Sequence, residues 1–159
     1  MPSSEDPNKI GVISDTHGLL RSAVEKAFKG VELIVHAGDV GKPEVLKALN
    51  KIAPVVAVRG NSDWGEWAKT LPAQEIVEIG EVLLYVIHDV HDIDLNPSAA
   101  GIRIVISGHS HAPSVVERNG VLFLNPGSAG LRRFKLPVSL ALVNIKGTKV
   151  DVELIDLEG

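Results

Sequence analysis

Seven residues that can bind a metal ion follow directly after five short apolar segments of the chain. Aspartate, histidine and asparagine dominate these positions, and glycines stand beside several of them. Ligands of α/β sheets bind at the carboxyl ends of strands, so we expect these side chains to meet at one place. The seven candidates are Asp15, His17, Asp39, Asn61, His88, His109 and His111.

Taken singly, each short motif also has an ordinary structural interpretation. Asp-x-His and Gly-Asp pairs are common in turns and helix caps, and a lone histidine at a strand end is typical of a packed side chain. Gly108-His109-Ser110-His111 is more specific, because side chains at i and i+2 of extended backbone point the same way. The successive intervals from Asp15 to His109 each match one strand plus its return connection. This joint spacing predicts a metal site.

The ligand types indicate which metals would bind. Carboxylate, imidazole and amide groups without sulfur suit Mn, Fe, Zn, Ni or Co better than Cu(I) or calcium. Seven ligands exceed the need of one ion, so two divalent ions that share a bridging carboxylate fit the number. Such a pair, about 3.5–4 Å apart, can clamp the attacking and leaving oxygens of an in-line phosphoryl displacement. Glycines 18, 38, 60 and 108 would let the backbone approach the ions closely.

The elements that must position these residues change in character along the chain. In the first half, apolar runs alternate with helical patterns, which predicts parallel strands joined by helices. In the second half, turn signals such as Asn119-Gly120 predict antiparallel hairpins. We therefore expect two sheets packed face to face with helices outside. The predicted strands are 10–14, 33–36, 54–58, 74–79, 82–88, 102–106, 114–118, 121–125, 139–144 and 149–155; the predicted helices cover 19–28 and a segment starting near Pro43.

Length and composition bound the class of protein. The chain has 159 residues and no cysteine, which excludes disulfides, thiolate metal sites and a cysteine nucleophile. A net charge of −4 disfavours a long nucleic-acid groove. The longest apolar run, Ile52 to Val58, is far shorter than the about 20 residues of a membrane span, and the polar N-terminus lacks a signal peptide. These features predict a cytoplasmic protein.

The order of the motifs resembles the calcineurin-like metallophosphoesterase superfamily, and most of all its small single-domain branch of bacterial and archaeal phosphodiesterases. The resemblance extends from Lys9 to about Asp156. It implies a four-layer α/β/β/α sandwich of two mixed β-sheets flanked by helices, in agreement with the strand pattern. We accordingly expect residues 1–159 to form one metallophosphoesterase domain, with residues 1–8 flexible.

The resemblance also implies a division of the ligands between two divalent metal ions, with Mn favoured over Ni, Zn, Fe or Co. Asp39 would bridge the ions opposite a bridging hydroxide that attacks phosphorus in line, and Asp39, Asn61 and His109 would be the catalytic residues. The implied activity is that of a phosphoesterase, more a phosphodiesterase than a monoesterase. The first ion would be held by Asp15, His17 and His111, and the second by Asn61, His88 and His109.

Two departures from the family pattern affect the substrate side. Many members carry a histidine directly after the motif asparagine, whereas this chain has Ser62, whose hydroxyl is too weak an acid to protonate a leaving oxygen. We therefore expect a preference for esters with good leaving groups. The fourth motif, which is often His-Gly-His, reads His88-Asp89-Val90-His91. His91 is either a surface-loop residue or a substrate contact, and Asn125 and Ser128 either line the site or cap a Pro-Gly turn.

For several other residues, the sequence leaves both a structural and a functional interpretation open. His36 is either a packed histidine that supports the ligands or a catalytic residue. Trp64 and Trp67 belong either to a lid, a base-stacking wall or a dimer contact, or to a loop packed on the core. The alternative function is a non-catalytic protein-interaction module similar to the small scaffold subunit of the retromer complex. The expected partner of the enzyme is a small phosphoester substrate, without a membrane or a long nucleic-acid duplex, and homo-oligomerisation stays open.

Overall fold

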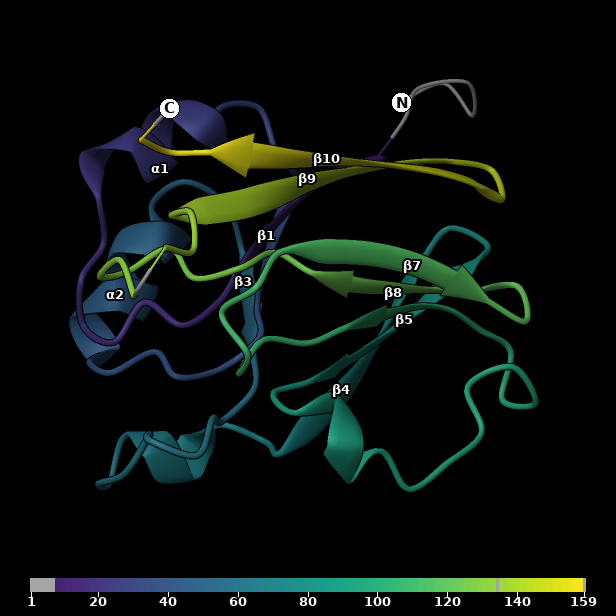
Figure 1. The fold of residues 1–159 in the computed structure, drawn as a ribbon, viewed down its shortest axis with the longest axis horizontal. Coiled ribbons are helices and arrows are strands. Elements are labelled where there is room, and N and C mark those ends of the chain that lie inside the picture. The colour runs from purple at the N-terminus through teal and green to yellow at the C-terminus, as the bar shows by residue number, and fades with distance from the viewer. Residues whose placement is uncertain (1–7, 134, 159) are drawn as a thin grey trace.

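The computed structural model describes residues 8–133 and 135–158. Within these residues, two five-stranded mixed β-sheets pack face to face, and α-helices lie on the outer side of the first sheet (Figure 1). The predicted α/β sandwich of two mixed sheets is confirmed. Of the segment expected to be flexible, residues 1–7 lie outside the described residues, and Asn8 pairs with Ile145.

The first sheet has the strand order β10-β9-β1-β2-β3. β1, β2 and β3 run parallel, as the alternation of apolar runs and helices predicted, and β9 pairs antiparallel with β1. The C-terminal hairpin thus returns to the first sheet, which its local turn pattern could not indicate. The strands are β1 (Asn8–Ile13), β2 (Leu33–His36), β3 (Val55–Ala57), β9 (Ser139–Lys146) and β10 (Lys149–Asp156).

Helices α1 (Ser22–Ala27) and α2 (Pro43–Asn50) cover the outer face of this sheet and lie together at the left of Figure 1. Their buried side chains, among them Val24 and Leu49, pack on residues of β1, β2 and β9. α1 is shorter than predicted, because the chain after β1 first follows the neighbouring loop, with Gly18 N–H donating to the Val40 carbonyl at 2.8 Å.

The second sheet has the order β4-β5-β6-β8-β7, with β5, β6 and β8 parallel. The Asn119-Gly120 turn joins β7 and β8 with positive φ at both residues, as a type I′ hairpin requires. The strands are β4 (Gln74–Ile79), β5 (Val82–Ile87), β6 (Ile102–Ile106), β7 (Ser114–Arg118) and β8 (Val121–Asn125).

In the described part of the chain, no α-helix covers the outer face of the second sheet. The 3-10 turn η2 (Val90–Asp92) and the loop after it pack Ile93 and Leu95 against this face. The loop carries Pro97, which disfavours helix in the residue before it. A second 3-10 turn, η1 (Ala68–Thr70), connects β3 to β4. The helices expected on this side are thus reduced to a single turn and a loop.

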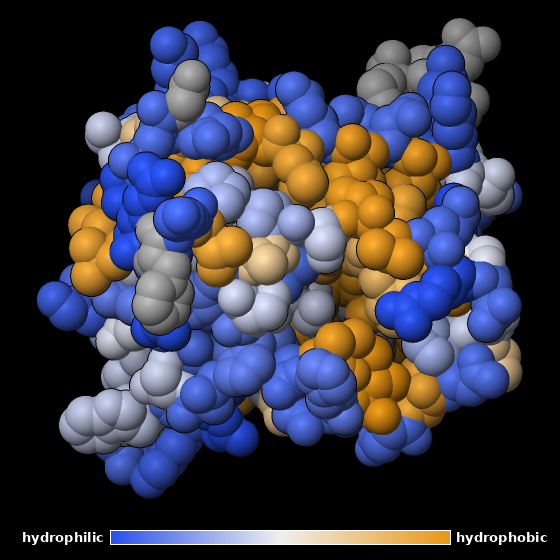
Figure 2. Space-filling model, in the orientation of Figure 1, coloured by the Kyte–Doolittle hydropathy of each residue, from blue (hydrophilic) through white to orange (hydrophobic). Residues whose placement is uncertain are grey.

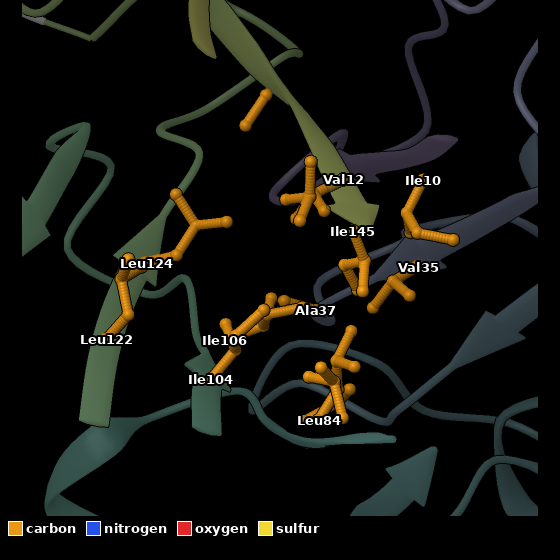
Figure 3. Close-up of a cluster of buried hydrophobic side chains, with 14 of the residues drawn as sticks. Ile10, Val12, Val35, Ala37, Leu84, Ile104, Ile106, Leu122, Leu124 and Ile145 are labelled. Atoms are coloured by element: carbon orange, nitrogen blue, oxygen red, sulfur yellow. The ribbon is translucent and has the colours of Figure 1, made fainter. Parts of the chain in front are cut away.

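The main hydrophobic core lies between the two sheets. Figure 3 shows side chains of both sheets pointing toward one another, with Val12 and Val35 on one side and Ile104 and Leu124 on the other. These four side chains are buried to 1% exposure or less. The core therefore fixes how the carboxyl ends of the parallel strands of one sheet meet those of the other.

The surface carries apolar side chains mainly at the strands. In Figure 2 most of the hydrophobic surface gathers in the upper middle and right of the view, and the left side is mainly hydrophilic. Exposed large apolar residues of the strands include Ile76, Val115 and Val116. No helix in residues 8–133 and 135–158 is long and apolar enough to cross a membrane.

Candidate metal centre

The loops that follow β1 and β2 form the floor of the site. They continue side by side beyond the strands, with Asp15 N–H donating to the Gly38 carbonyl at 3.0 Å and His17 N–H to the Asp39 carbonyl at 2.9 Å. The loop after β6 joins them from the other sheet, because His109 N–H donates to Asp15 Oδ2 at 3.1 Å. The two sheets therefore meet at this edge through ligand-bearing loops.

Backbone strain is concentrated at the candidate ligands. Six non-glycine residues of the described chain have positive φ, a conformation that L-residues rarely adopt. One of them, Asn119, belongs to a hairpin turn that needs it. The five others were all predicted as metal ligands. Strain of this kind is typical of functional sites, where the surrounding structure holds side chains in place. The five are Asp15, His17, Asp39, His109 and His111.

The two carboxylates lie among the histidine rings. Asp15 Oδ1 is 3.4 Å from His111 Nε2, 3.7 Å from His17 Nε2 and 3.9 Å from His88 Nε2. Asp39 Oδ2 is 3.2 Å from His88 Nε2 and 3.6 Å from His17 Nε2. Asp15 and Asp39 thus both lie beside His17, which belongs to the first predicted ligand set, and beside His88, which belongs to the second.

The histidine rings also lie in the predicted pairs. His17 and His111 have ring centroids 5.4 Å apart, and the rings of His88 and His109 are 5.2 Å apart. Asn61 joins the second pair through its Oδ1 atom, 3.2 Å from His109 Nδ1. The structure therefore brings all seven predicted ligands into one continuous cluster.

Several buried atoms of this cluster lack a hydrogen-bond partner. They are Asp15 Oδ1, His88 Nε2 and His111 Nδ1. Buried polar atoms are nearly always paired, and unpaired ones at a single place indicate a missing ion or water. Two sets of three donor atoms lie within 4.8 Å of one another, namely Asp15 with His17 and His111, and Asp15 with Asp39 and His88. The residues present therefore fit divalent metal ions.

The orientation of His88 fits the same interpretation. Its Nδ1 lies 2.8 Å from the Ala37 carbonyl, which can only accept a hydrogen bond, so Nδ1 carries the proton. Nε2 is then free and faces the two carboxylates. Metal-binding histidines usually donate their second ring N–H in this way, which fixes the tautomer and the ring.

Without an ion, the carboxylates and histidines stabilise one another as charged pairs. Burial opposes charge on Asp39, but the His88 ring 3.2 Å away and the Ser62 N–H outweigh it and hold the pKa of this carboxyl well below its usual range. The pKa of His17 is raised mainly by the Asp15 carboxylate 3.7 Å away. Burial lowers the pKa of His88, yet Asp39 and Asp15 raise it more, so the net shift is upward. A divalent ion would take the place of these protons.

Asp63 is a supporting residue that the sequence analysis did not single out. It is buried and accepts hydrogen bonds from Val40 N–H at 3.2 Å, Gly41 N–H at 2.9 Å and Gly60 N–H at 2.9 Å. These bonds tie the loop after β2 to the loop after β3. The available signal was its place at the end of Gly60-Asn61-Ser62-Asp63, but turns often carry aspartate there.

Two of the glycines are required by close contacts between loops. A Cβ atom on Gly60 would lie 2.1 Å from Asp39 Oδ1, and one on Gly108 would lie 2.0 Å from Ser14 Oγ. The sequence analysis expected glycines here for approach to the ions. In the structure they let the loops of the two sheets approach the carboxylates.

His36 is packed beneath the site as a neutral side chain. Gly38 N–H donates to its Nδ1 at 3.1 Å, so its Nε2–H donates to Thr16 Oγ1 at 3.0 Å. Complete burial lowers the pKa of His36 to about 4. Of the two interpretations left open, the structure favours the support of the ligand loops.

The predicted substrate residues divide into supporting and exposed groups. Asn125 Nδ2 donates to the Gly108 carbonyl at 2.9 Å, and Ser128 Oγ donates to the Asp15 carbonyl at 3.0 Å, so these two buried residues hold ligand loops. Ser62 is exposed, and its N–H donates to Asp39 Oδ1 at 2.9 Å. The side chain of His91 is 88% exposed and contacts Asp89.

Asp89, which stands in place of a glycine in the fourth motif, lies beside the site. Its Oδ2 atom is 3.7 Å from His109 Nε2 and its Oδ1 atom is 2.9 Å from His91 Nδ1. It therefore links the exposed histidine to the exposed end of the ligand cluster. Trp64 is exposed, and Trp67 packs partly on the core beside the helices.

The fold and the cluster define a two-sheet α/β sandwich with an aspartate–histidine site at the strand ends. Residues 9–148 match the model of the calcineurin-like phosphoesterase superfamily domain. The chain belongs to this superfamily.

Relatives agree with this membership, and a solved structure shows the same fold. A probable metallophosphoesterase of Methanocaldococcus jannaschii is 38% identical over 162 residues, which cover 94% of this chain and 81% of the relative. A phosphodiesterase of the same organism is 30% identical over 138 residues, covering 75% and 82%. The structure of Vps29 of Entamoeba histolytica complexed with zinc has the same fold, with a TM-score of 0.72, 23% identity and coverage of 94% and 99%.

Proposed function

We propose that this protein is a divalent-metal-dependent phosphodiesterase with a dinuclear metal centre. The observation that carries the proposal is the cluster of seven ligands with buried, unpaired atoms of Asp15, His88 and His111 at its centre. Membership of a phosphoesterase superfamily and the likeness to a relative named phosphodiesterase support it.

The proposed ligand sets follow the pairs of rings. Asp15, His17 and His111 would hold the first ion, Asn61, His88 and His109 would hold the second, and Asp39 would be shared by both. Bound divalent ions would activate an attacking water and neutralise charge that develops on the phosphoryl oxygens. The donor set contains oxygen and nitrogen without sulfur, which suits Mn, Ni, Zn, Fe and Co. Mn is the first metal to test, as the superfamily resemblance implies.

The catalytic roles of the chain's own residues follow from exposure. His17, Asn61 and His109 are exposed ligands, so they can face an incoming phosphoester, whereas Asp15 and His111 lie beneath. Asp39 keeps its negative charge at neutral pH because its pKa is lowered. The substrate is a small phosphoester in the cytoplasm, and Ser62 leaves the site without an imidazole acid at that position, so good leaving groups are preferred.

The test is hydrolysis by chelator-stripped protein to which Mn, Ni, Zn, Mg or no metal is returned. The substrates are bis-p-nitrophenyl phosphate, a diester, and p-nitrophenyl phosphate, a monoester. We expect metal-restored turnover with a higher rate on the diester, and its loss in His109→Ala. If no added metal restores turnover in protein that binds two ions, the proposed enzyme activity is wrong and the non-catalytic interaction module becomes the favoured function.

A further inference from the structure

Two hollows of nearly equal size open on either side of the exposed end of the ligand cluster. The first, the Arg59 hollow, measures about 290 Å³ and is lined by Arg59, Ala73, Gln74 and Asp92 together with Asn61 and His88. The second, the Phe123 groove, measures about 280 Å³ and runs over the outer face of the second sheet; its lining includes Val90, His91, Val116, Arg118 and Phe123.

Both hollows share the same two residues, Asp89 and His109. These two side chains are 3.7 Å apart and form the ridge between the hollows. A group bound at His109 can therefore extend to either side. Two larger hollows, of about 800 Å³ and 700 Å³, contain none of the predicted ligands.

The size of each hollow suits one part of a ligand. Complete small-molecule sites usually measure about 300–1,000 Å³. Each of the two hollows is slightly smaller than this range, so each suits a single ester substituent, and only together do they suit a whole ligand. A phosphodiester has two substituents on one phosphorus atom, whereas a monoester has one.

The linings of the two hollows differ in chemistry. The Phe123 groove has an apolar floor of Val90, Val116 and Phe123, and the guanidinium carbon of Arg118 lies 5.0 Å from the centre of the Phe123 ring. Among the described residues, the Arg59 hollow has no Phe, Tyr or Trp in its lining and combines the polar side chains of Gln74 and Asp92 with the apolar Ala73 and Ile87.

We propose that the Phe123 groove and the Arg59 hollow are the two substituent pockets of a phosphodiester whose phosphorus lies at His109. Each pocket takes one of the two ester groups, and the ring of Phe123 suits an aryl group in the groove. This inference rests on the proposed function, because it assigns the reacting phosphoryl group to the ligand cluster.

The experiment blocks each pocket with a tryptophan and uses a matched control. Val116→Trp fills the groove, and Val115→Trp changes the next residue of β7, which is similarly exposed (41% against 45%) but points to the opposite face of the strand. Ala73→Trp fills the Arg59 hollow, and Ala99→Trp, in the exposed loop before β6, is its control. Tryptophan is tolerated in strands, so Val116→Trp and Val115→Trp should both fold.

We expect each blocking variant to lower kcat/KM for bis-p-nitrophenyl phosphate about tenfold, and each control to stay within about twofold of the unchanged protein. The monoester p-nitrophenyl phosphate should be slowed by at most one of the two blocking variants. Equal rates for Val116→Trp and Val115→Trp on the diester would overturn the inference, as would equal losses on monoester and diester in both blocking variants.

Binding gives a readout that does not need turnover. Diphenyl phosphate is added to the zinc-loaded protein, and amide resonances are followed by NMR. We expect shifts at Val116 and Phe123 in the groove and at Ala73 and Gln74 in the hollow; shifts confined to one hollow would contradict the inference. Diphenyl phosphate could shift the resonances of both hollows while no phosphoester is hydrolysed with any metal. That result would support the two pockets and contradict the proposed catalytic function.

Discussion

At the scale of single residues, the site depends on ligands whose backbone is held at positive φ, a conformation that L-residues rarely adopt. Asp15, His17 and Asp39 adopt positive φ, and the histidines around them share two buried carboxylates. Both carboxylates lie in a largely buried place, where a negative charge is costly. Such a charge is favourable only with a cation close by, whether a protonated histidine or a metal ion.

Replacing Asp39 by asparagine tests the bridging role. Asp39→Asn keeps the shape of the side chain but removes the charge between His17 and His88. We expect metal-dependent diester hydrolysis to fall at least about a hundredfold and the stoichiometry of bound metal to drop below two. The measurements are kcat/KM and metal content by elemental analysis. The control is Asp94→Asn, an exposed residue outside the site; normal turnover by Asp39→Asn would contradict the two-ion assignment.

The buried His36 should make the free energy of unfolding depend on pH. Its pKa is about 4 in the folded protein and near 6.5 when unfolded, so protons bind the unfolded chain first as the pH falls. The free energy of unfolding should therefore decrease from pH 6.5 to about pH 4, by about 3 kcal/mol from this group. Denaturant unfolding of metal-free protein measures it. His36→Asn should be less stable at pH 7 and show a flatter decrease; equal slopes would exclude His36 as the cause.

At the scale of elements, the site depends on loops that are held to one another by buried polar bonds. Strand ends alone leave Asp39 and Asn61 on separate loops, after β2 and after β3. Asp63 joins those loops through three backbone N–H groups, and Asn125 and Ser128 hold the loops after β6 and β1. The ligand geometry is thus supported from outside the ligand set.

Asp63→Asn tests this support. An amide has one acceptor oxygen and no charge, so it cannot satisfy the three N–H donors of Val40, Gly41 and Gly60 together. We expect the free energy of unfolding to fall by about 2–4 kcal/mol, because buried donors lose their partner, and metal affinity to weaken. Denaturant unfolding and metal titration measure both effects. Asp92→Asn, an exposed residue on η2, serves as the stability control; matching stabilities of the two variants would count against the assigned role.

At the scale of the whole molecule, the candidate metal centre connects the two sheets. Asp15 and Asp39 follow strands of the first sheet, and His88, His109 and His111 follow strands of the second. The apolar core holds the sheets together from within, and an ion at the cluster would bind both at their common edge. Metal binding should therefore be coupled to the stability of the whole fold.

Removal of metal tests this coupling. The folded protein binds the ions through residues of both sheets, which the unfolded chain does not hold together. Free metal at about 100 times its dissociation constant should raise the free energy of unfolding by about 2.7 kcal/mol. Thermal unfolding with a chelator and with added Mn or Zn should show a higher Tm with metal. His111→Ala, which removes one ligand, should reduce the rise; an identical Tm with and without metal in the unchanged protein would contradict the coupling.

The sequence by itself determined the ligand types, their order and the strand ends that carry them. These properties are local: Leu33–His36 has the same bounds in the sequence prediction and in the structure, and Asn119-Gly120 forms the turn that its residues require. The superfamily resemblance rested on that order of motifs, and the match over residues 9–148 bears it out.

Only the tertiary structure decided which of the polar residues near the strand ends face each other. His36 and His88 both lie at or beside the end of an apolar segment, yet one is a neutral support and the other contacts Asp39, because their neighbours come from distant parts of the chain. The same holds for the C-terminal hairpin, which joins β1 across more than a hundred residues, and for Asp63. Local patterns set backbone conformation and the side chains available, whereas burial and partners depend on how the sheets pack.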